Sequence, residues 1–443
     1  MNKVTTSINF SMKATGLLLA FAVLLVSCGQ RAPRQLLSDE ALLDTVERCT
    51  IKYFTEFADP ATGLARERNN DSNGNIVTTG GSGFGMMAVI AGAERGYYPK
   101  AEGIERIGKM VGSLEKLERF HGAWAHWYDA DSGKPFSFSE FDDGGDLVET
   151  AFMVQGLLTA RQWLADKDTV LAGRCDALWK EVEWDWYTRG TDSLYWHWSK
   201  NYGWKMNHRI KGYDETLITY VLAASSPTHP IRPEVYEACY KKSDYYYNGK
   251  EYYGIKLPLG MELGGPLFFS HYSFLGLDPR GLKDAYCDYF ERNTAHTRIH
   301  LEYAKANPRG HKGYGENLWG FTSSDDPYVG YCSHHPGTPD DNGTVSPTAA
   351  ISSIVYTPDE SRKLMGYLFY ETDMFGPYGF YDAYNPGCVN PVIDHYLAID
   401  QGPEAVMIEN YRSALLWKLF MSSPEILPGL HRLGFYYDDK QSI

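Results

Sequence analysis

Apolar residues recur at helical spacing along almost the whole chain, and this periodicity constrains the fold more than any other feature. Most of the periodic segments are amphipathic or apolar all round, so each must bury a face against a neighbour. The segments are residues 39–57, 83–97, 101–117, 146–164, 169–186, 214–224, 232–241, 282–307, 346–354, 358–370 and 403–421. They predict an all-α protein, and their alternation with elaborate loops suggests an (α/α)6 toroid in which inner and outer helices pair.

Long loops rich in glycine, proline, aspartate and aromatic residues separate these segments. The longest are residues 119–145, 187–213, 244–270 and 310–345. Loops of this length in a compact domain are usually functional, and in a toroid they build a central cleft at one end of the ring. Local signals also mark helix starts: Thr357 and Glu360 flank Pro358 and predict a capping box.

The N-terminus has the pattern of a bacterial lipoprotein signal peptide. Lys3 and Lys13 precede an apolar run over residues 14–26, which is short for a membrane span. Small residues then flank Cys28 as they do in a lipobox, and this resemblance implies cleavage before Cys28 and lipidation of its side chain. Ordinary secretion with cleavage a few residues later is the alternative.

We therefore expect a signal peptide at residues 1–27, a lipid-anchored linker at 28–36 and a single catalytic domain at 37–443. The protein would face the periplasm from the outer membrane, touching the bilayer only through its lipid, and we expect a monomer. The formal net charge of −14 argues against nucleic acid and anionic membrane surfaces as partners, because both require a concentrated basic face.

Neither the cysteines nor the asparagine-rich turn predicts a metal site. Residues 69–74 match the opening of a calcium loop, but its twelfth position is Gly80, so a plain turn is favoured. The other cysteines lack metal-site spacing, and we expect buried thiols or at most one disulfide. They are Cys49, Cys175, Cys239, Cys287, Cys332 and Cys388.

A histidine- and aspartate-bearing loop is also interpreted without a metal. His334, His335, Asp340 and Asp341 lie in a proline-rich segment whose spacing does not direct them to one ion, so solvated polar residues are favoured. The chain has no nucleophile elbow with a matching histidine and acid, and no phosphate-binding or dinucleotide fingerprint.

The aromatic content indicates a carbohydrate ligand. Tyrosine, phenylalanine and tryptophan make up 14% of the chain, and flat aromatic faces stack on pyranose rings while carboxylates bind the hydroxyls. Trp196, Trp198 and Trp204 share one loop and are candidates for substrate binding. For any single ring, a place in a tyrosine-rich core is the alternative.

Hydrolysis of a glycosidic bond needs one protonated carboxyl group and a second carboxylate, so acids beside aromatic loops are the catalytic candidates. Asp142, Asp146 and Glu149 lie four and three residues apart where a loop meets a helix. The positive end of that helix would favour their ionised state. The alternative is structural, because Asp146 with Glu149 is itself a capping box.

Two further helix starts carry acids. Asp214 is the natural N-cap of one helix, which leaves the adjacent Glu215 free to point into a cleft. Asp400 precedes the C-terminal helix that bears Glu404 and Glu409. These acids could instead cap a helix or pair with Arg412.

At these segments the chain resembles the glucoamylase-like family of secreted bacterial proteins, and within it glycoside hydrolase family 144, which degrades β-1,2-glucan. The matching stretches cover nearly all of the domain. They are residues 141–158, 194–206, 222–230, 264–280, 313–326 and 398–417. The resemblance implies an (α/α)6 toroid, no metal or other cofactor, and hydrolysis with inversion at the anomeric carbon.

The resemblance also implies roles for residues. Glu215 would be the general acid, Asp146 or Asp142 would position and deprotonate the water, and Glu149 would support them. Asp400 would bind sugar hydroxyls. The remaining assignments to substrate binding, from one matching stretch, are Tyr314, Glu316 and Trp319. The Tyr213–Asp214 pair departs from the aromatic–asparagine pair expected in relatives, so hydrogen bonding beside the acid can differ.

Two modes of cleavage remain open, together with two other functions. We expect exo action that releases sophorose from the non-reducing end of β-1,2-glucooligosaccharides, because an enzyme at the periplasmic face meets chains that are already cut. An endo-β-1,2-glucanase is the alternative. A non-catalytic glycan-binding lipoprotein and a hydrolase of another glucan linkage are the further alternatives.

Overall fold

The computed structural model describes residues 34–70, 75–137 and 139–438. The chain divides into two units, Met1–Leu36 and Leu37–Ile443, and every helix and strand in the described ranges lies in the second. The expected signal peptide, Cys28 and residues 71–74 of the calcium-type turn lie outside the described residues. No helix within those ranges is both long and apolar enough to cross a membrane.

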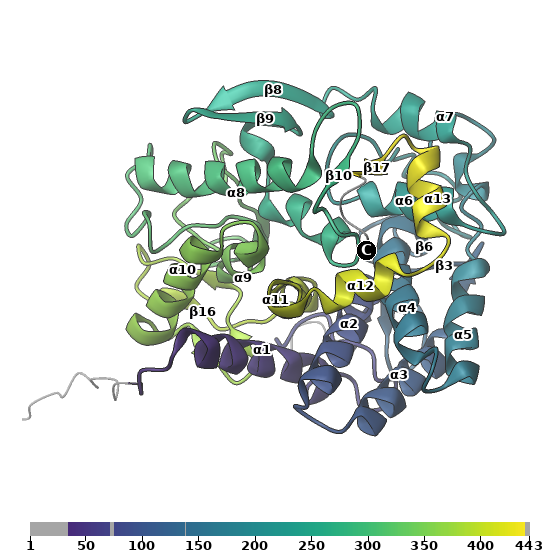
Figure 1. Cartoon of the computed structure of the whole chain (residues 1–443), viewed down its shortest axis with the longest axis horizontal. Helices are drawn as coiled ribbons and strands as arrows, with labels where there is room; N and C mark the ends of the chain where they lie inside the picture. Colours follow the sequence, from purple (N-terminus) through teal and green to yellow (C-terminus); the bar gives the residue numbers. More distant parts are fainter. Residues whose placement is uncertain (1–33, 71–74, 138, 439–443) are drawn as a thin grey trace, which may run out of the picture. The chain divides into compact units, whose positions relative to one another are not determined.

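Six buried segments of the second unit contact one another in a closed ring (Figure 1). In ring order they are α2 (Thr79–Arg95), α4 (Leu147–Leu164), α6 (Leu217–Ser225), the 3-10 turns η5 (Leu267–Ser270) and η6 (Tyr272–Phe274), α9 (Pro347–Ser352) and α11 (Ala398–Ser413). Each touches the next, and α11 returns to α2. Every residue of α6 and α9 is buried, as expected for helices covered on all sides.

Outer segments alternate with these inner ones along the chain. They are α1 (Asp39–Thr55), α3 (Lys100–Leu114), α5 (Thr169–Lys180), α7 (Pro233–Val235) with the π-turn η3 (Tyr236–Tyr240), α8 (Tyr289–Ala306) and α10 (Pro358–Glu371). Each of these helices buries the face that packs on the inner ring and exposes the opposite face. The helix α3, for example, buries Ile107, Met110 and Leu114. Alternating inner and outer segments around a closed ring confirm the predicted all-α (α/α)6 toroid.

The remaining helical elements are short. They are η2 (Trp186–Thr188), η4 (Glu262–Gly264), η7 (Ser353–Val355), α12 (Leu415–Met421) and α13 (Ile426–Arg432). The last of these packs against α6, at a place where the periodicity did not predict a helix.

The long loops contain small antiparallel sheets. One has three strands, β1 (Ile76–Thr78), β4 (Trp127–Asp129) and β5 (Pro135–Phe136). The paired strands are β2 (Arg119–Phe120) with β3 (Ala123–Trp124), β6 (Gly145–Asp146) with β7 (His197–Trp198), β8 (Tyr247–Tyr252) with β9 (Ile255–Leu259), β10 (Leu282–Lys283) with β17 (Tyr436–Tyr437), β11 (Ser323–Asp326) with β12 (Gly330–Ser333), β13 (Phe375–Gly376) with β14 (Gly379–Phe380), and β15 (Ala383–Tyr384) with β16 (Val392–Ile393). Some of these pairs are hairpins, whereas β6 with β7 and β10 with β17 join segments far apart in the chain.

Several expected helix boundaries are wrong, each for a local reason. The segment 282–307 becomes helical only at Tyr289, because Asp288 accepts hydrogen bonds from the first-turn amides and caps α8. The segment 403–421 is two helices, which break at Ala414, where the backbone is left-handed with a φ of 58°. The capping box at Thr357 is not made: the Thr357 hydroxyl contacts the Ser353 carbonyl and Ser361 instead.

All six cysteines of the described domain are free thiols. Cys175 and Cys239 are buried as expected, whereas the other four are partly exposed.

Polar contacts join the last inner helix to the first two helices of the domain. Arg412 of α11 pairs with Glu47 of α1 at 2.5 Å, not with an acid of its own helix as considered from the sequence. Glu409 pairs with Arg95 at the end of α2, and Thr50 of α1 donates a hydrogen bond to Glu404 at 2.7 Å. These contacts close the ring between its earliest and latest helices.

The inner helices α2 and α4 cross so closely that glycine is required on both. A Cβ built on Gly83 would overlap the backbone of Phe152 and Met153, and one built on Gly156 would overlap the Gly83 carbonyl. One turn earlier, the Gly80 amide donates a hydrogen bond of 2.7 Å to Glu149 Oε2. The close crossing therefore places the α2 backbone where it binds an α4 carboxylate.

The Gly83→Ala variant should unfold at lower urea concentration, with a loss of about 1–3 kcal/mol in the free energy of unfolding, because its methyl group must displace a rigid backbone segment. Gly173→Ala in the outer helix α5 is the matched control, since a Cβ there meets nothing within 4 Å. That variant should be neutral or gain up to about 1 kcal/mol. Equal stability of Gly83→Ala and wild type would contradict the close crossing.

Candidate active site

A cavity of about 420 Å³ opens where the inner helices begin. Each of the wall residues in the following list lies at or near the start of an inner segment. They are Thr78, Asp146, Glu149, Glu215, Thr216, Phe268, Tyr272, Leu397 and Ile399. The amide ends of α2, α4, α6 and α11 thus converge on the cavity, and their dipoles favour negative charge there.

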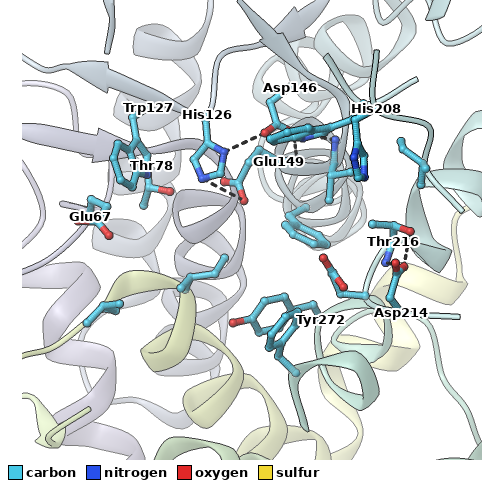
Figure 2. Close-up of a pocket in the computed structure, with 18 of the residues that line it drawn as sticks. Glu67, Thr78, His126, Trp127, Asp146, Glu149, His208, Asp214, Thr216 and Tyr272 are labelled. Carbon is cyan, nitrogen blue, oxygen red and sulfur yellow. Dashed lines mark hydrogen bonds and ion pairs between the residues drawn. The ribbon is translucent and has the colours of Figure 1, made fainter. Parts of the chain in front are cut away.

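His126 lies beside Asp146 and Glu149 on one wall (Figure 2), and Asp142 is a third carboxylate near its ring. Its Nδ1 is 2.8 Å from Asp146 Oδ2 and 4.0 Å from Asp142 Oδ2, and its Nε2 is 3.9 Å from Glu149 Oε1. Burial opposes protonation of the ring, but Glu149, Asp146 and Asp142 outweigh it and raise the pKa of His126 to about 10. His126 is therefore an imidazolium at neutral pH.

Asp146 has two structural contacts at once. Its Oδ1 accepts the amides of Val148 and Glu149, each at 2.9 Å, so it caps α4 as the structural alternative held. Its Oδ2 binds His126, which leaves the capped carboxylate at the cavity wall in a fixed orientation.

Glu149 does not complete the capping box of that structural alternative. Its Oε2 accepts from the Gly80 amide of α2, so its carboxylate points across the helix crossing into the cavity. Burial raises the pKa of Glu149 to about 7, and the positive charge of His126 limits the rise.

Glu215 comes from the turn before α6, which begins at Leu217, three residues later than expected. Asp214 Oδ1 accepts the Thr216 amide at 2.9 Å, and the Glu215 carbonyl accepts from the Ser273 hydroxyl at 2.5 Å, so the turn is held on both sides. Burial, and then the charge of Asp214, raises the pKa of Glu215 well above its ordinary value. Burial thus favours the protonated form of the carboxyl group on this wall, opposite a carboxylate–imidazolium cluster on the wall of α4.

Asp142 and Asp400 lie behind the cavity wall, both nearly inaccessible to solvent. Asp142 is 3.2 Å from His197 Nε2 and reaches the cavity only through His126. Of the two residues expected to position water, only Asp146 lines the cavity. Asp400 lies in the first turn of α11 and not before it, and the Tyr272 hydroxyl, which lines the cavity, donates to it at 3.3 Å.

Aromatic residues line the cavity, but not all the expected ones. Trp196 lies in the wall, together with Trp127. Phe268 and Tyr272 stack with ring centroids 4.9 Å apart. Trp198 and Trp204 pack around Trp186 outside the cavity lining, because β7 and its following loop turn back onto η2.

The binding residues expected from the stretch 313–326 do not line the cavity either. Trp319 is 0% exposed and belongs to the core. Tyr314 donates a hydrogen bond to the buried Asp341 at 2.7 Å, and Glu316 forms a surface ion pair with Lys363. The interpretation of His334 and Asp341 as solvated residues is wrong, because the loop folds back and buries both.

Several cavity residues were missed in the sequence. His126 lies between Trp124 and Trp127, an aromatic setting that is a usable signal for a cleft residue. Arg68 and Tyr331 carry no comparable signal. Arg68 reaches the wall because Asp325 of β11 binds its guanidinium at 2.7 Å, and Tyr331 does so because β12 pairs with β11.

A family model described as Glycoamylase matches residues 207–424. The chain is 50% identical to the structure of an endo-β-1,2-glucanase from Chitinophaga pinensis, bound to sophorotriose and glucose, with a TM-score of 0.88. The match covers 90% of this chain and 99% of that one.

The chain is also 43% identical to an exo β-1,2-glucooligosaccharide sophorohydrolase (non-reducing end) from Parabacteroides distasonis. That match covers 90% of this chain but 58% of the relative, so the chain spans less than two thirds of its length. The structure of an endo-β-1,2-glucanase from Talaromyces funiculosus shares the fold, with a TM-score of 0.65 at 11% identity. That match covers 90% of this chain and 91% of the other.

Proposed function

Because the chain belongs to the glucoamylase-like family, within the β-1,2-glucan-degrading glycoside hydrolase family 144, we propose that it is an enzyme that hydrolyses β-1,2-glucosidic bonds. We assign it exo action on β-1,2-glucooligosaccharides, with inversion and release of sophorose from the non-reducing end. The observation that carries this proposal is that Glu215, whose pKa is raised by burial, lines the same cavity as the Asp146–His126–Glu149 cluster.

Each part of the reaction has a candidate residue. Glu215 donates its proton to the leaving glycosidic oxygen, because its carboxyl group is kept neutral by burial. Asp146 orients a water molecule and accepts its proton on the opposite side of the sugar ring. His126 and the amide end of α4 stabilise the negative charge of Asp146 and Glu149, so these groups stay available beside a neutral acid.

The raised pKa of Glu215 predicts how the rate depends on pH. The acid is active only when protonated, so kcat/KM should fall as pH rises through its folded-state pKa, which lies well above the ordinary value. A pH series of kcat/KM on a β-1,2-glucooligosaccharide measures this descending limb. Glu149→Gln should retain the limb, although the pKa of Glu149 is about 7; loss of the limb in that variant would assign it to Glu149 instead.

The earliest products from linear β-1,2-glucooligosaccharides distinguish the two modes of cleavage. Chromatography of short incubations should show sophorose alone, with starch and β-1,3-glucan left intact as controls. A mixed ladder would support endo action, which the likeness to the Chitinophaga pinensis enzyme favours. If no β-1,2-linked chain is cut, the proposed enzyme activity is wrong and a glycan-binding protein takes its place.

We also propose that the protein is a periplasmic lipoprotein anchored to the outer membrane through Cys28. The support is the sequence alone: Lys3 and Lys13, the apolar run over residues 14–26, and the small residues around Cys28. Cells fed a palmitate analogue should label the wild-type protein, whereas Cys28→Ser should be unlabelled. Labelling of the Cys28→Ser variant would contradict the assignment.

A further inference from the structure

Three metal-ligating side chains of different types converge at the β11–β12 hairpin, outside the lining of the active-site cavity. They are Asp326 at the end of β11, Cys332 in β12 and His334 just after it. His334 Nε2 lies 3.4 Å from Asp326 Oδ2 and 3.4 Å from Cys332 Sγ. One ligand atom from each of the three lies within 4.8 Å of the other two.

The surroundings of His334 orient its Nε2 toward the other two ligands. Its Nδ1 is 3.1 Å from the Asp340 carbonyl, which can only accept, so Nδ1 carries the hydrogen of the neutral ring. The Nε2 lone pair then faces the Asp326 carboxylate. The same lone pair faces the Cys332 sulfur, and the His334 and Asp326 side chains are nearly inaccessible to solvent.

The Asp326 carboxylate is held in place from every side. Its Oδ1 accepts the amides of Tyr328 and Val329, and its Oδ2 accepts from Asn342 at 2.6 Å and from the Thr344 hydroxyl at 3.1 Å. Such outer contacts are what orient the ligands of a metal site. The cluster therefore has fixed ligands and supporting hydrogen bonds.

We propose that Asp326, Cys332 and His334 bind a zinc-like divalent cation. Ligands held tetrahedrally at about 2.0–2.3 Å from zinc lie about 3.3–3.7 Å from one another, and both distances to His334 Nε2 fall in that range. A thiolate and a carboxylate balance the charge of the ion, and the imidazole is a usual third ligand. Water takes the fourth position.

The hairpin links this site to the cavity of the proposed enzyme. Tyr331, next to Cys332, lines the cavity, and Asp325, next to Asp326, binds Arg68 of the cavity wall at 2.7 Å. A cation that joins β11, β12 and the loop after β12 would fix the positions of Tyr331 and of the Asp325–Arg68 ion pair at the cavity wall. The site is structural and supplies no group to the hydrolysis.

Metal binding is tested on the purified full-length domain, independently of any enzyme activity. Chelator-treated protein is titrated with Zn²⁺ by calorimetry and, separately, with Co²⁺ by absorption. One equivalent of Zn²⁺ should bind per chain, and Co²⁺ should give a near-ultraviolet sulfur-to-cobalt charge-transfer band. Bound zinc should also raise the Tm, since the ion binds only the folded cluster.

Matched variants locate the site. Cys332→Ser should abolish the band and His334→Gln should lower Zn²⁺ affinity at least tenfold, whereas Cys49→Ser in α1 and His335→Gln should behave as wild type. Circular dichroism checks that each variant is folded. Absence of stoichiometric Zn²⁺ binding by wild type, or a band that survives in folded Cys332→Ser, would overturn the proposal. Neither result changes the product assay, so the two proposals fail separately.

Discussion

The Glu215→Gln variant should lose about 10²- to 10⁴-fold in kcat on β-1,2-glucooligosaccharides, with KM changed much less. The amide keeps the size and hydrogen-bonding capacity of the side chain, so substrate still binds, but it has no proton to give the leaving oxygen. The buried setting raises the pKa of Glu215 and so favours the protonated form, which is the proton donor. Steady-state rates from sophorose release measure the effect.

Asp214→Asn is the control for that experiment. Its Oδ1 can still accept the Thr216 amide, so the turn before α6 is preserved. The charge of Asp214 contributes to the raised pKa of Glu215, so its removal should move the descending pH limb to lower pH and change kcat by less than about tenfold. A near-normal kcat for Glu215→Gln would remove Glu215 from the role of general acid.

The Asp146→Asn variant should lose kcat by a similar factor of about 10²- to 10⁴-fold without unfolding. Asparagine is as good an N-cap as aspartate, so α4 keeps the contacts to the Val148 and Glu149 amides. It has no negative charge to accept a proton from water or to stabilise the His126 imidazolium, so the pKa of His126 should also fall. Rate measurements and thermal unfolding together separate loss of chemistry from loss of structure.

Asp168→Asn tests the same substitution at another N-cap. Asp168 caps the outer helix α5 through the Leu171 amide at 2.9 Å and has no place in the cavity lining. Both variants should have nearly wild-type Tm, and Asp168→Asn should have wild-type kcat. An Asp146→Asn enzyme as active as Asp168→Asn would show that this carboxylate is only a cap.

Acids at helix starts were predictable from sequence because capping is local chemistry. Asp146 and Glu149 lie within one helical turn. Glu215 follows Asp214, whose side chain accepts a hydrogen bond from the Thr216 amide. The toroid was predictable for a related reason, since each amphipathic or apolar segment demands a covering partner. The periodicity could not give the break at Ala414 or the late start of α8, which depend on single backbone and capping contacts.

The rest of the site depends on contacts between segments far apart in the chain. His126 reaches α4 because the neighbouring Ala125 bridges to Gly145 just before that helix, and Tyr331 reaches the cavity through a hairpin whose strands carry no helical signal. Aromatic content likewise cannot separate a cleft from a core. Trp196 lines the cavity, whereas Trp319 is an equally plausible residue in sequence and is fully buried.

The closure of the inner ring has a consequence for how the chain folds. The helices α1 and α2, near the start of the domain, both pack on α11. In the sequence, α11 lies more than 300 residues after them. Pairing at such separation is slow, because a long chain segment must be ordered before the contact forms. A nascent chain therefore exposes the apolar faces of its first helices until almost all of it has been synthesised. Fragments that end before Ala398 should aggregate, so premature termination yields insoluble protein and not a smaller working domain.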